Sequence, residues 1–283
     1  MNPSEVRTII IQALFSDDDL MDSLVLKGGN ALALVHKVGD RASVDIDCSI
    51  LDEFSDVEDI GNKIRLSLER EFGRYDYSVF DFGFEAKPAK QNEFVPDWWG
   101  GYVCTFKLVD QITFEKYKGD YYQLRNRASE VGPSQKKVFK IDISKFEACQ
   151  DKVIADINDL VVYAYSLEMI AVEKLRAICQ QLPDYELNYF RTARARDFYD
   201  IHEIVNTKNI DLHSDANLQL IKDMFQVKKV PLEFLAQVKT QRSFHQVDWP
   251  SVTSSVSGKI SDFDYYFDFV TNLIGQLEAL WKK

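Results

Sequence analysis

Residues 26–50 read LKGGNALALVHKVGDRASVDIDCSI, and this stretch decides the predicted fold. Its glycine pair, Gly28 and Gly29, stands directly before a run that favours a helix over residues 31–37. Two glycines at the start of a helix leave bare backbone N–H groups, which attract an anion such as a phosphate. After a turn, the sequence predicts a strand over residues 43–50.

Two acids, Asp45 and Asp47, lie in the predicted strand and are separated by Ile46. Successive side chains of a strand point to opposite faces, so the two carboxylates share a face. Adjacent carboxylates repel each other, and a divalent cation with oxygen ligands relieves that repulsion. The pattern predicts a metal site beside a phosphate-binding turn, as phosphoryl or nucleotidyl transfer requires. The alternatives are a solvated edge strand for the acids and a plain tight turn for the glycines.

A third acid, Asp142, lies in the predicted strand over residues 138–143, between Ile141 and Ile143. The flanking isoleucines indicate that one face of this strand is buried. A buried charge without a partner is very costly, so we expect Asp142 to have one. An ordinary salt-bridged acid is the alternative interpretation.

The chain resembles the DNA polymerase β-like nucleotidyltransferase superfamily, in which a glycine pair, a short helix and a D-x-D strand follow in this order. It is similar in finer detail to the AbiEii/AbiGii-type nucleotidyltransferases, which are toxins of bacterial abortive-infection and toxin–antitoxin systems. The residues that carry this likeness are Lys27-Gly28-Gly29 … Arg41-Ala42-Ser43-Val44-Asp45-Ile46-Asp47. The resemblance implies an α+β fold, with a mixed β-sheet domain flanked by helices and followed by a helical domain.

A second block strengthens the resemblance. The family signature E-K-x-x-A … R-D-x-x-D matches EKLRA at residues 173–177 and RDFYD at residues 196–200. The resemblance implicates Lys174 and Asp197 in activity, with Lys174 reaching the nucleotide from the helical half and facing Asp45 and Asp47 across a cleft. A purely structural ion pair between Lys174 and an acid of the next helix is the alternative.

The resemblance implies a metal-dependent transfer of NMP from an NTP to an acceptor. Mg²⁺ or Mn²⁺ is expected on Asp45, Asp47 and Asp142. The NTP is expected to contact Lys27, Gly28, Gly29, Asn30, Arg41 and Ser43. Asn30 departs from the Ser or Thr that relatives often carry after the glycine pair. RNA, in particular a tRNA 3′ end, is the expected acceptor, and a cognate antitoxin is an expected partner. The alternatives are a protein or small-molecule acceptor, or a catalytically weak nucleotide-binding module.

Composition sets limits on these expectations. The 283 residues carry a formal net charge of −11, which disfavours broad electrostatic binding of nucleic acid and suits a basic protein partner. No uninterrupted apolar run approaches the roughly 18 residues of a membrane span, and the first residues do not resemble a signal peptide. The four cysteines form no C-x-x-C pair and the four histidines do not cluster, which predicts a cytoplasmic protein without a zinc site.

Domain organisation follows from a change in periodicity. From about Leu160 onward the apolar residues recur at helical spacing to the end of the chain. We therefore predict an α/β nucleotidyltransferase domain over residues 1–155 and a helical domain over residues 156–283 that completes the cleft.

Overall fold

The computed structural model describes residues 1–38, 45–89, 95–131, 136–187, 190–256 and 258–282. The described residues group into two compact units. The first lies within Met1–Asn30, Ser43–Cys149 and Val153–Ala164, and the second within Ala31–Ala42, Gln150–Lys152 and Tyr165–Lys283.

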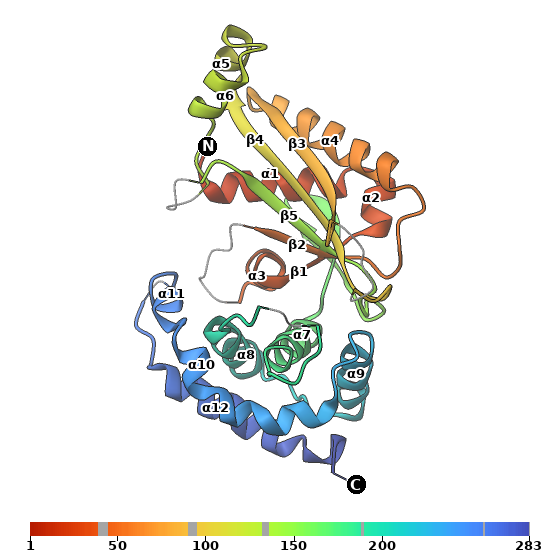
Figure 1. The fold of residues 1–283 in the computed structure, drawn as a ribbon, viewed down its shortest axis with the longest axis vertical. Helices are drawn as coiled ribbons and strands as arrows, with labels where there is room; N and C mark the ends of the chain where they lie inside the picture. The colour runs from red at the N-terminus through yellow and green to blue at the C-terminus, as the bar shows by residue number, and fades with distance from the viewer. Residues whose placement is uncertain (39–44, 90–94, 132–135, 188–189, 257, 283) are drawn as a thin grey trace. The chain divides into compact units, whose positions relative to one another are not determined.

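A seven-stranded sheet forms the centre of the first unit (Figure 1). Its strands are β1 (Val25–Lys27), β2 (Ile46–Ser49), β3 (Tyr77–Lys87), β4 (Gly101–Asp110), β5 (Phe139–Ser144), β6 (Val153–Ile157) and β7 (Leu160–Ala164). They are ordered β3-β4-β5-β2-β1-β7-β6. The pairs β2–β5 and β1–β7 are parallel and the other neighbours are antiparallel, so the sheet is mixed.

One face of this sheet is covered by α1 (Pro3–Phe15) and α4 (Val57–Gly73), which pack on each other (Figure 1). Phe72 of α4 meets Phe106 of β4, with their ring centroids 5.9 Å apart. Ile46 and Ile141 are fully buried on the same face. Because side chains alternate along a strand, the residues between these apolar positions point to the opposite face.

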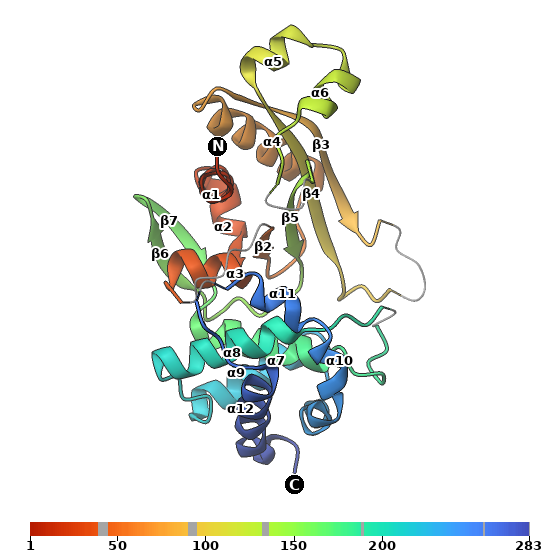
Figure 2. The same ribbon diagram turned by 90° about the vertical axis from the view of Figure 1, so that its left-hand side faces the viewer.

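Two short helices, α5 (Gln111–Lys116) and α6 (Tyr121–Arg127), follow the end of β4 and project beyond β3 and β4 (Figure 2). A small separate core holds this projection on the sheet. Its buried members are Phe80, Val109, Leu124 and Ala128, with Phe114 and Tyr117 packed against them. The helix α2 (Asp18–Ser23) precedes β1, and the turn α3 (Gly28–Asn30) follows it.

The second unit is helical (Figure 2). Its elements are η1 (Ala31–Val35), α7 (Leu167–Cys179), α8 (Ala195–Lys208), α9 (Asp215–Gln226), η3 (Leu232–Gln241), α10 (Arg242–Gln246), α11 (Trp249–Thr253), α12 (Phe263–Gln276) and η4 (Glu278–Leu280). The helix α8 contacts α7, α11 and α12. Phe198 of α8 packs against Phe263 and Phe267 of α12, which makes an aromatic core.

The predicted α+β class with a mixed sheet and flanking helices is confirmed. The helical spacing of apolar residues also predicts helices over residues 3–15, 57–72 and 167–181, and the structure has helices at Pro3–Phe15, Val57–Gly73 and Leu167–Cys179. Among the residues that the structure describes, no helix has the length and apolar character needed to span a membrane.

The prediction of helical structure from Leu160 was wrong for the first residues of that segment. Residues 153–164 form the β6–β7 hairpin instead. Asn158 and Asp159 both have positive φ, at 54° and 64°, and Asn and Asp are well suited to such a two-residue turn. The β-branched residues on both sides of this turn favour strands.

Two local predictions in the opening stretch also need correction. The strand β2 begins at Ile46, so Asp45 lies in the bend before it and not within it. Residues 31–35 form a π-helical turn, in which the His36 N–H donates to the Ala31 carbonyl at 3.2 Å. Such turns are rare and often lie at functional sites.

Candidate active site

A row of charged side chains crosses the face of the sheet opposite α1 and α4 in the first unit. Lys27 of β1 is the register partner of Asp47 of β2, and Asp47 is the register partner of Asp142 of β5. Register partners point to the same face, so the three side chains lie side by side on adjacent strands. The two carboxylates that the sequence singled out separately are thus brought together by the parallel pairing of β2 and β5.

The backbone of Gly28 lies close against the Asp47 carboxylate. Its φ is +66°, a conformation that other L-residues rarely adopt, and a Cβ atom here would lie 2.8 Å from Asp47 Oδ2. The glycine therefore lets the backbone turn after β1 approach the carboxylate closely. This requirement explains the first glycine of the pair without reference to any ligand.

Asp45 and Asn30 are linked through the backbone. The Asn30 side chain is fully buried and donates from Nδ2 to the Asp45 carbonyl at 2.6 Å. This bond fixes the bend in which Asp45 lies and leaves the Asp45 side chain exposed. Because the Asn30 amide donates to this carbonyl, the structure gives Asn30 a positioning role, and its contact with a phosphate stays a prediction.

Lys27 is buried and already has partners within the first unit. Its ammonium donates to Ser144 Oγ at 3.2 Å and lies 3.7 Å from Glu147 Oε1. Glu147 is likewise buried, so the two charges offset each other. A contact between Lys27 and a nucleotide stays a prediction. The predicted residues Arg41 and Ser43 lie outside the described residues.

Asp142 is held between two lysines. Lys87 Nζ donates to Asp142 Oδ1 at 3.0 Å, and Lys140 Nζ donates to the other oxygen, Oδ2. Burial alone raises the pKa of a carboxyl group, but the hydrogen bonds and charges of the two lysines outweigh it and keep the pKa of Asp142 below its ordinary value. The pKa of Lys140 is raised by Asp142 and, more weakly, by Asp45 and Asp47, against the opposing effect of burial.

The donor set suits a hard divalent cation. Asp47 and Asp142 supply carboxylate oxygens from neighbouring strands, and Mg²⁺ and Mn²⁺ prefer such oxygens. No preformed group of three His, Cys, Asp or Glu side chains for a metal was found within the described part of the chain. Asp142 is engaged by Lys87 and Lys140, and Asp45 is exposed in the bend before β2.

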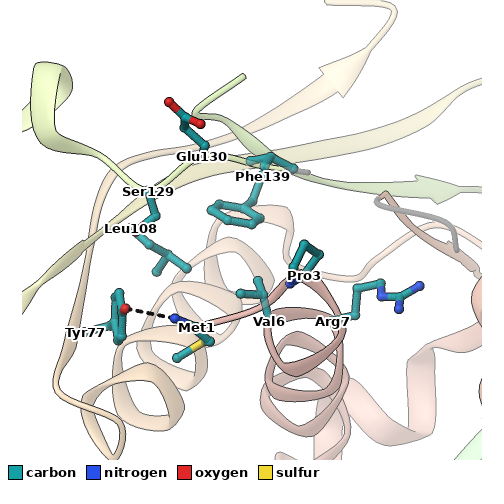
Figure 3. A pocket seen from close by; sticks show the side chains of 10 residues that line it. Met1, Pro3, Val6, Arg7, Tyr77, Leu108, Ser129, Glu130 and Phe139 are labelled. Atoms are coloured by element: carbon teal, nitrogen blue, oxygen red, sulfur yellow. Dashed lines mark hydrogen bonds between the residues drawn. The ribbon is translucent and has the colours of Figure 1, made fainter. Parts of the chain in front are cut away.

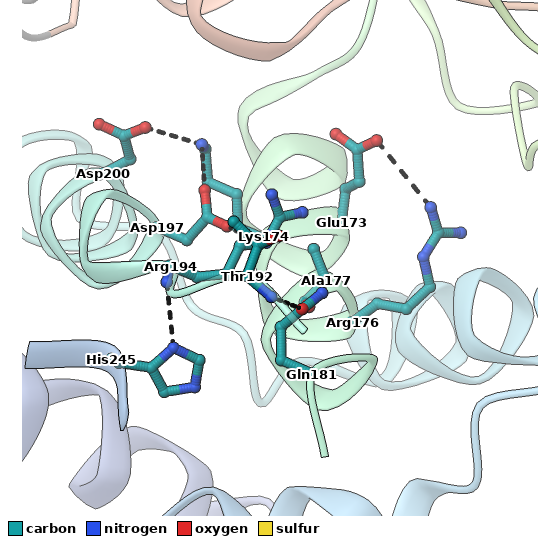
Figure 4. Close-up of polar contacts among 10 residues, drawn as sticks. All are labelled: Glu173, Lys174, Arg176, Ala177, Gln181, Thr192, Arg194, Asp197, Asp200 and His245. Carbon is teal, nitrogen blue, oxygen red and sulfur yellow. Dashed lines mark hydrogen bonds and ion pairs between the residues drawn. The ribbon is translucent and has the colours of Figure 1, made fainter. Parts of the chain in front are cut away.

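The second unit contains a separate charged cluster, shown in Figure 4. Lys174 of α7 donates to Asp197 Oδ1 at 2.9 Å and to Asp200 Oδ2 at 2.7 Å, both on α8. Arg194 Nε lies 3.1 Å from the second oxygen of Asp197. Lys174 and both aspartates are buried, so the structural ion pair that the sequence left open is present. A catalytic role for Lys174 and Asp197 stays a prediction.

His245 of α10 lies next to this cluster and was not predicted from the sequence (Figure 4). It is fully buried, and its Nδ1 accepts from the Arg194 N–H at 3.1 Å. Protonation of Nδ1 would replace this acceptor with a second donor. Burial lowers the pKa of His245 to about 4, against a weaker opposing effect of Asp197. His245 is therefore neutral at pH 7 and helps to fix the start of α8.

Two hollows elsewhere in the first unit do not suit a nucleotide. The one in Figure 3, beside Met1 and Phe139, has a volume of about 20 Å³, which is room for about one water molecule. A larger groove of about 490 Å³ is lined by six acids and one lysine, Lys63. Its negative lining would repel a triphosphate.

Lys87 and Lys140 were not predicted from the sequence. Lys140 precedes Asp142 by two residues in a strand, so their shared face was available as a signal. Lys87 comes from β3, 55 residues away from Asp142 along the chain, and no local pattern predicts that contact.

Comparison with known proteins places these features in a family. Residues 9–269 match the family described as "Nucleotidyl transferase AbiEii toxin, Type IV TA system". A comparison with curated proteins found no match.

Two solved structures are similar to this chain. JHP933 from Helicobacter pylori has 15% sequence identity and a TM-score of 0.51, and the match covers 98% of this chain and 91% of that chain. An antigenic nucleotidyltransferase-like protein from Paracoccidioides brasiliensis has 14% identity and a TM-score of 0.39, with 80% of this chain and 94% of that chain covered. At the identity of the first structure, the likeness concerns the fold alone.

Gly28→Ala is expected to destabilise the first unit. The positive φ costs about 1–2 kcal/mol for a residue with a Cβ atom, and the Asp47 carboxylate must also move away. Chemical unfolding measures the loss. Gly73→Ala is the matched control, because a Cβ atom there meets nothing within 4 Å. Equal stability of the two variants would contradict the described approach of Gly28 to Asp47.

Lys174→Met is expected to reduce the free energy of unfolding by about 3–5 kcal/mol, because two buried carboxylates lose their shared cation. The double variant Lys174→Met/Asp200→Asn should recover part of this loss, since one stranded charge is removed with it. Urea unfolding measures both changes. Lys222→Met, at an exposed lysine of α9, is the control. A Lys174 variant as stable as this control would show that the cluster contributes nothing to the fold.

Stability should depend on His245 at mildly acidic pH. The pKa of His245 is lowered from 6.5 to about 4 in the folded chain, so below pH 6.5 the unfolded state binds a proton that the folded state does not. This contribution is complete above pH 6.5 and falls as the pH drops toward 4. His245→Gln should weaken that dependence, as measured by urea unfolding at pH 7 and pH 4.5. His213→Gln, at a less buried histidine, is the control, and identical pH profiles for all three proteins would refute the assignment.

Proposed function

Because this chain belongs to the AbiEii family of nucleotidyl transferase toxins, we propose that it transfers NMP from an NTP to the 3′ end of an RNA, with tRNA the first candidate. The membership carries the reaction class, nucleotidyl transfer from an NTP. The metal requirement and the acceptor are the parts that we add to it.

The observation that carries the proposal is the in-register pair Asp47 and Asp142, with Gly28 against it. Two carboxylates on neighbouring strands beside a glycine turn provide anionic oxygens and backbone N–H groups within one small region. This is the combination that a divalent ion and a triphosphate need together. We assign Asp47, Asp142 and Asp45 as the residues that would hold Mg²⁺ or Mn²⁺. When bound, the ion would neutralise charge on the triphosphate.

Asp142 has two candidate roles, as a general base and as a ligand of the cation, and the pKa of its carboxyl group distinguishes between them. A general base works best when its pKa lies near the working pH. The lysines instead hold the pKa of Asp142 below its ordinary value, which makes the carboxylate a weaker base. We therefore assign Asp142 to cation binding. The backbone N–H groups of Gly28 and Gly29 would hold the phosphates. For Lys174 and Asp197, the proposed role in activity rests on the family signature that these residues match.

An RNA acceptor is supported by the α5–α6 projection. In a chain of net charge −11, this segment combines exposed aromatic and basic side chains. Tyr121 and Tyr122 are 55% and 73% exposed, and the Arg127 guanidinium lies 4.4 Å from the centre of the Tyr117 ring. Exposed rings and cations of this kind stack on bases and contact phosphates of single-stranded RNA. We therefore propose that this segment contacts the acceptor.

The family description also names a type IV toxin–antitoxin system. We propose accordingly that a cognate antitoxin opposes the toxicity of this protein in the cell. The proposal follows from the family alone.

Asp47→Asn should reduce the rate of transfer at least a hundredfold. An amide is a poor ligand for a hard cation, and it no longer balances the charge of the neighbouring lysines. The measurement incubates the protein with each of four NTPs labelled at the α-phosphate, with Mg²⁺, and with total bacterial RNA or protein as acceptor. Label should appear on RNA and depend on Mg²⁺.

Asp52→Asn, at an exposed acid of the same unit, is the control and should transfer like the wild type. Label on protein would overturn the RNA acceptor and keep the reaction class. Transfer by Asp47→Asn at the wild-type rate would remove Asp47 from the active site.

A further inference from the structure

Both oxygens of the Asp142 carboxylate are engaged by ammonium groups. Lys87 contacts Oδ1 and Lys140 contacts Oδ2. The two lysines come from different strands, β3 and β5, and approach the carboxylate separately. Neither lysine contributes to the apolar core, since their side chains are 61% and 35% exposed. Their ammonium groups neutralise the charge of the Asp142 carboxylate.

These lysines would oppose a divalent cation at the same carboxylate. Like charges a few ångströms apart near a protein surface repel each other, and the repulsion grows in proportion to the charge of the cation. A cation bound to Asp142 would meet this repulsion from each ammonium that stays in place. Lys140 also interacts electrostatically with Asp45 and Asp47, so it competes with a divalent cation for all three carboxylates.

A bound nucleotide would relieve the repulsion between the two lysines and the divalent cation. An NTP that carries a divalent ion retains net negative charge on its phosphates, and a lysine ammonium is a compact donor suited to phosphate. The aliphatic stems of Lys87 and Lys140 are long, flexible and partly in solvent, so the ammonium groups can exchange a carboxylate partner for a phosphate partner without moving a strand.

We propose that Lys87 and Lys140 form a polyphosphate-binding pair, which neutralises Asp142 in the absence of nucleotide and transfers to the phosphates when an NTP binds with its divalent ion. This inference rests on the proposed function. It makes metal and nucleotide binding mutually dependent, because each ligand relieves the repulsion that the other would meet. The divalent ion alone should therefore bind weakly.

The test measures two affinities by titration calorimetry. Mn²⁺ alone is the first probe, and inorganic tripolyphosphate in the presence of Mn²⁺ is the second. Lys140→Met removes the charge and keeps most of the apolar stem. It should bind Mn²⁺ alone roughly tenfold more tightly and tripolyphosphate roughly tenfold more weakly than the wild type. Lys140→Arg keeps the charge and should lie between the two in both titrations.

Lys107→Met is the matched control, because Lys107 pairs with Asp81 and not with Asp142. It should leave both affinities unchanged. Lys87→Met provides a second variant at a more exposed lysine and should shift both affinities in the same directions as Lys140→Met.

Opposite changes in the two affinities support the proposal. A loss of both affinities together, or no change in either, overturns it and leaves the lysines a structural role. NTP transfer by the wild-type protein, measured on the same preparation, tests the proposed function separately, so failure of one is distinguishable from failure of the other.

Discussion

The parallel pairing of β2 with β5 is the constraint on which the candidate active site depends. Its register places Asp47 beside Asp142, on the face of the sheet that α1 and α4 do not cover. A shift of one residue in this pairing would turn the carboxylate of the shifted strand into the apolar layer occupied by Ile46 and Ile141, where an unpaired charge is very costly. Burial of the isoleucines on one face thus fixes the acids on the other.

Both units contain carboxylates whose charge is neutralised by lysines. In the first, two lysines neutralise the Asp142 carboxylate. In the second, Lys174 serves Asp197 and Asp200 together. Lys87 and Lys140 are partly exposed, whereas Lys174 is buried and joins α7 to two acids of α8. A charge on the surface is thus suited to ligand exchange, and a buried one contributes chiefly to the stability of its unit.

Much of this arrangement was predictable from local patterns. Alternation along the strand placed Asp47 on one face, and the isoleucines around Asp142 did the same for that acid. The i, i+2 spacing misplaced Asp45, which lies in the bend before β2. The sequence does not contain the register between strands, so it could not place Asp47 against Asp142 or bring Lys87 to it. The β6–β7 hairpin was not predicted because the apolar residues of β7 continue into the apolar run of α7, which hides the turn at Asn158 and Asp159. His245 was missed because its environment comes from distant helices.

We expect Asp47 and Asp142 to bind jointly the cation that accompanies the nucleotide. Crystals grown with Mn²⁺ and a non-hydrolysable NTP analogue test this most directly, since anomalous scattering locates the manganese without reference to the sequence. We predict an anomalous peak in contact with both carboxylates, with Lys140 on the phosphates. Manganese and nucleotide bound away from Asp47 and Asp142, with Lys87 and Lys140 still on Asp142, would contradict it.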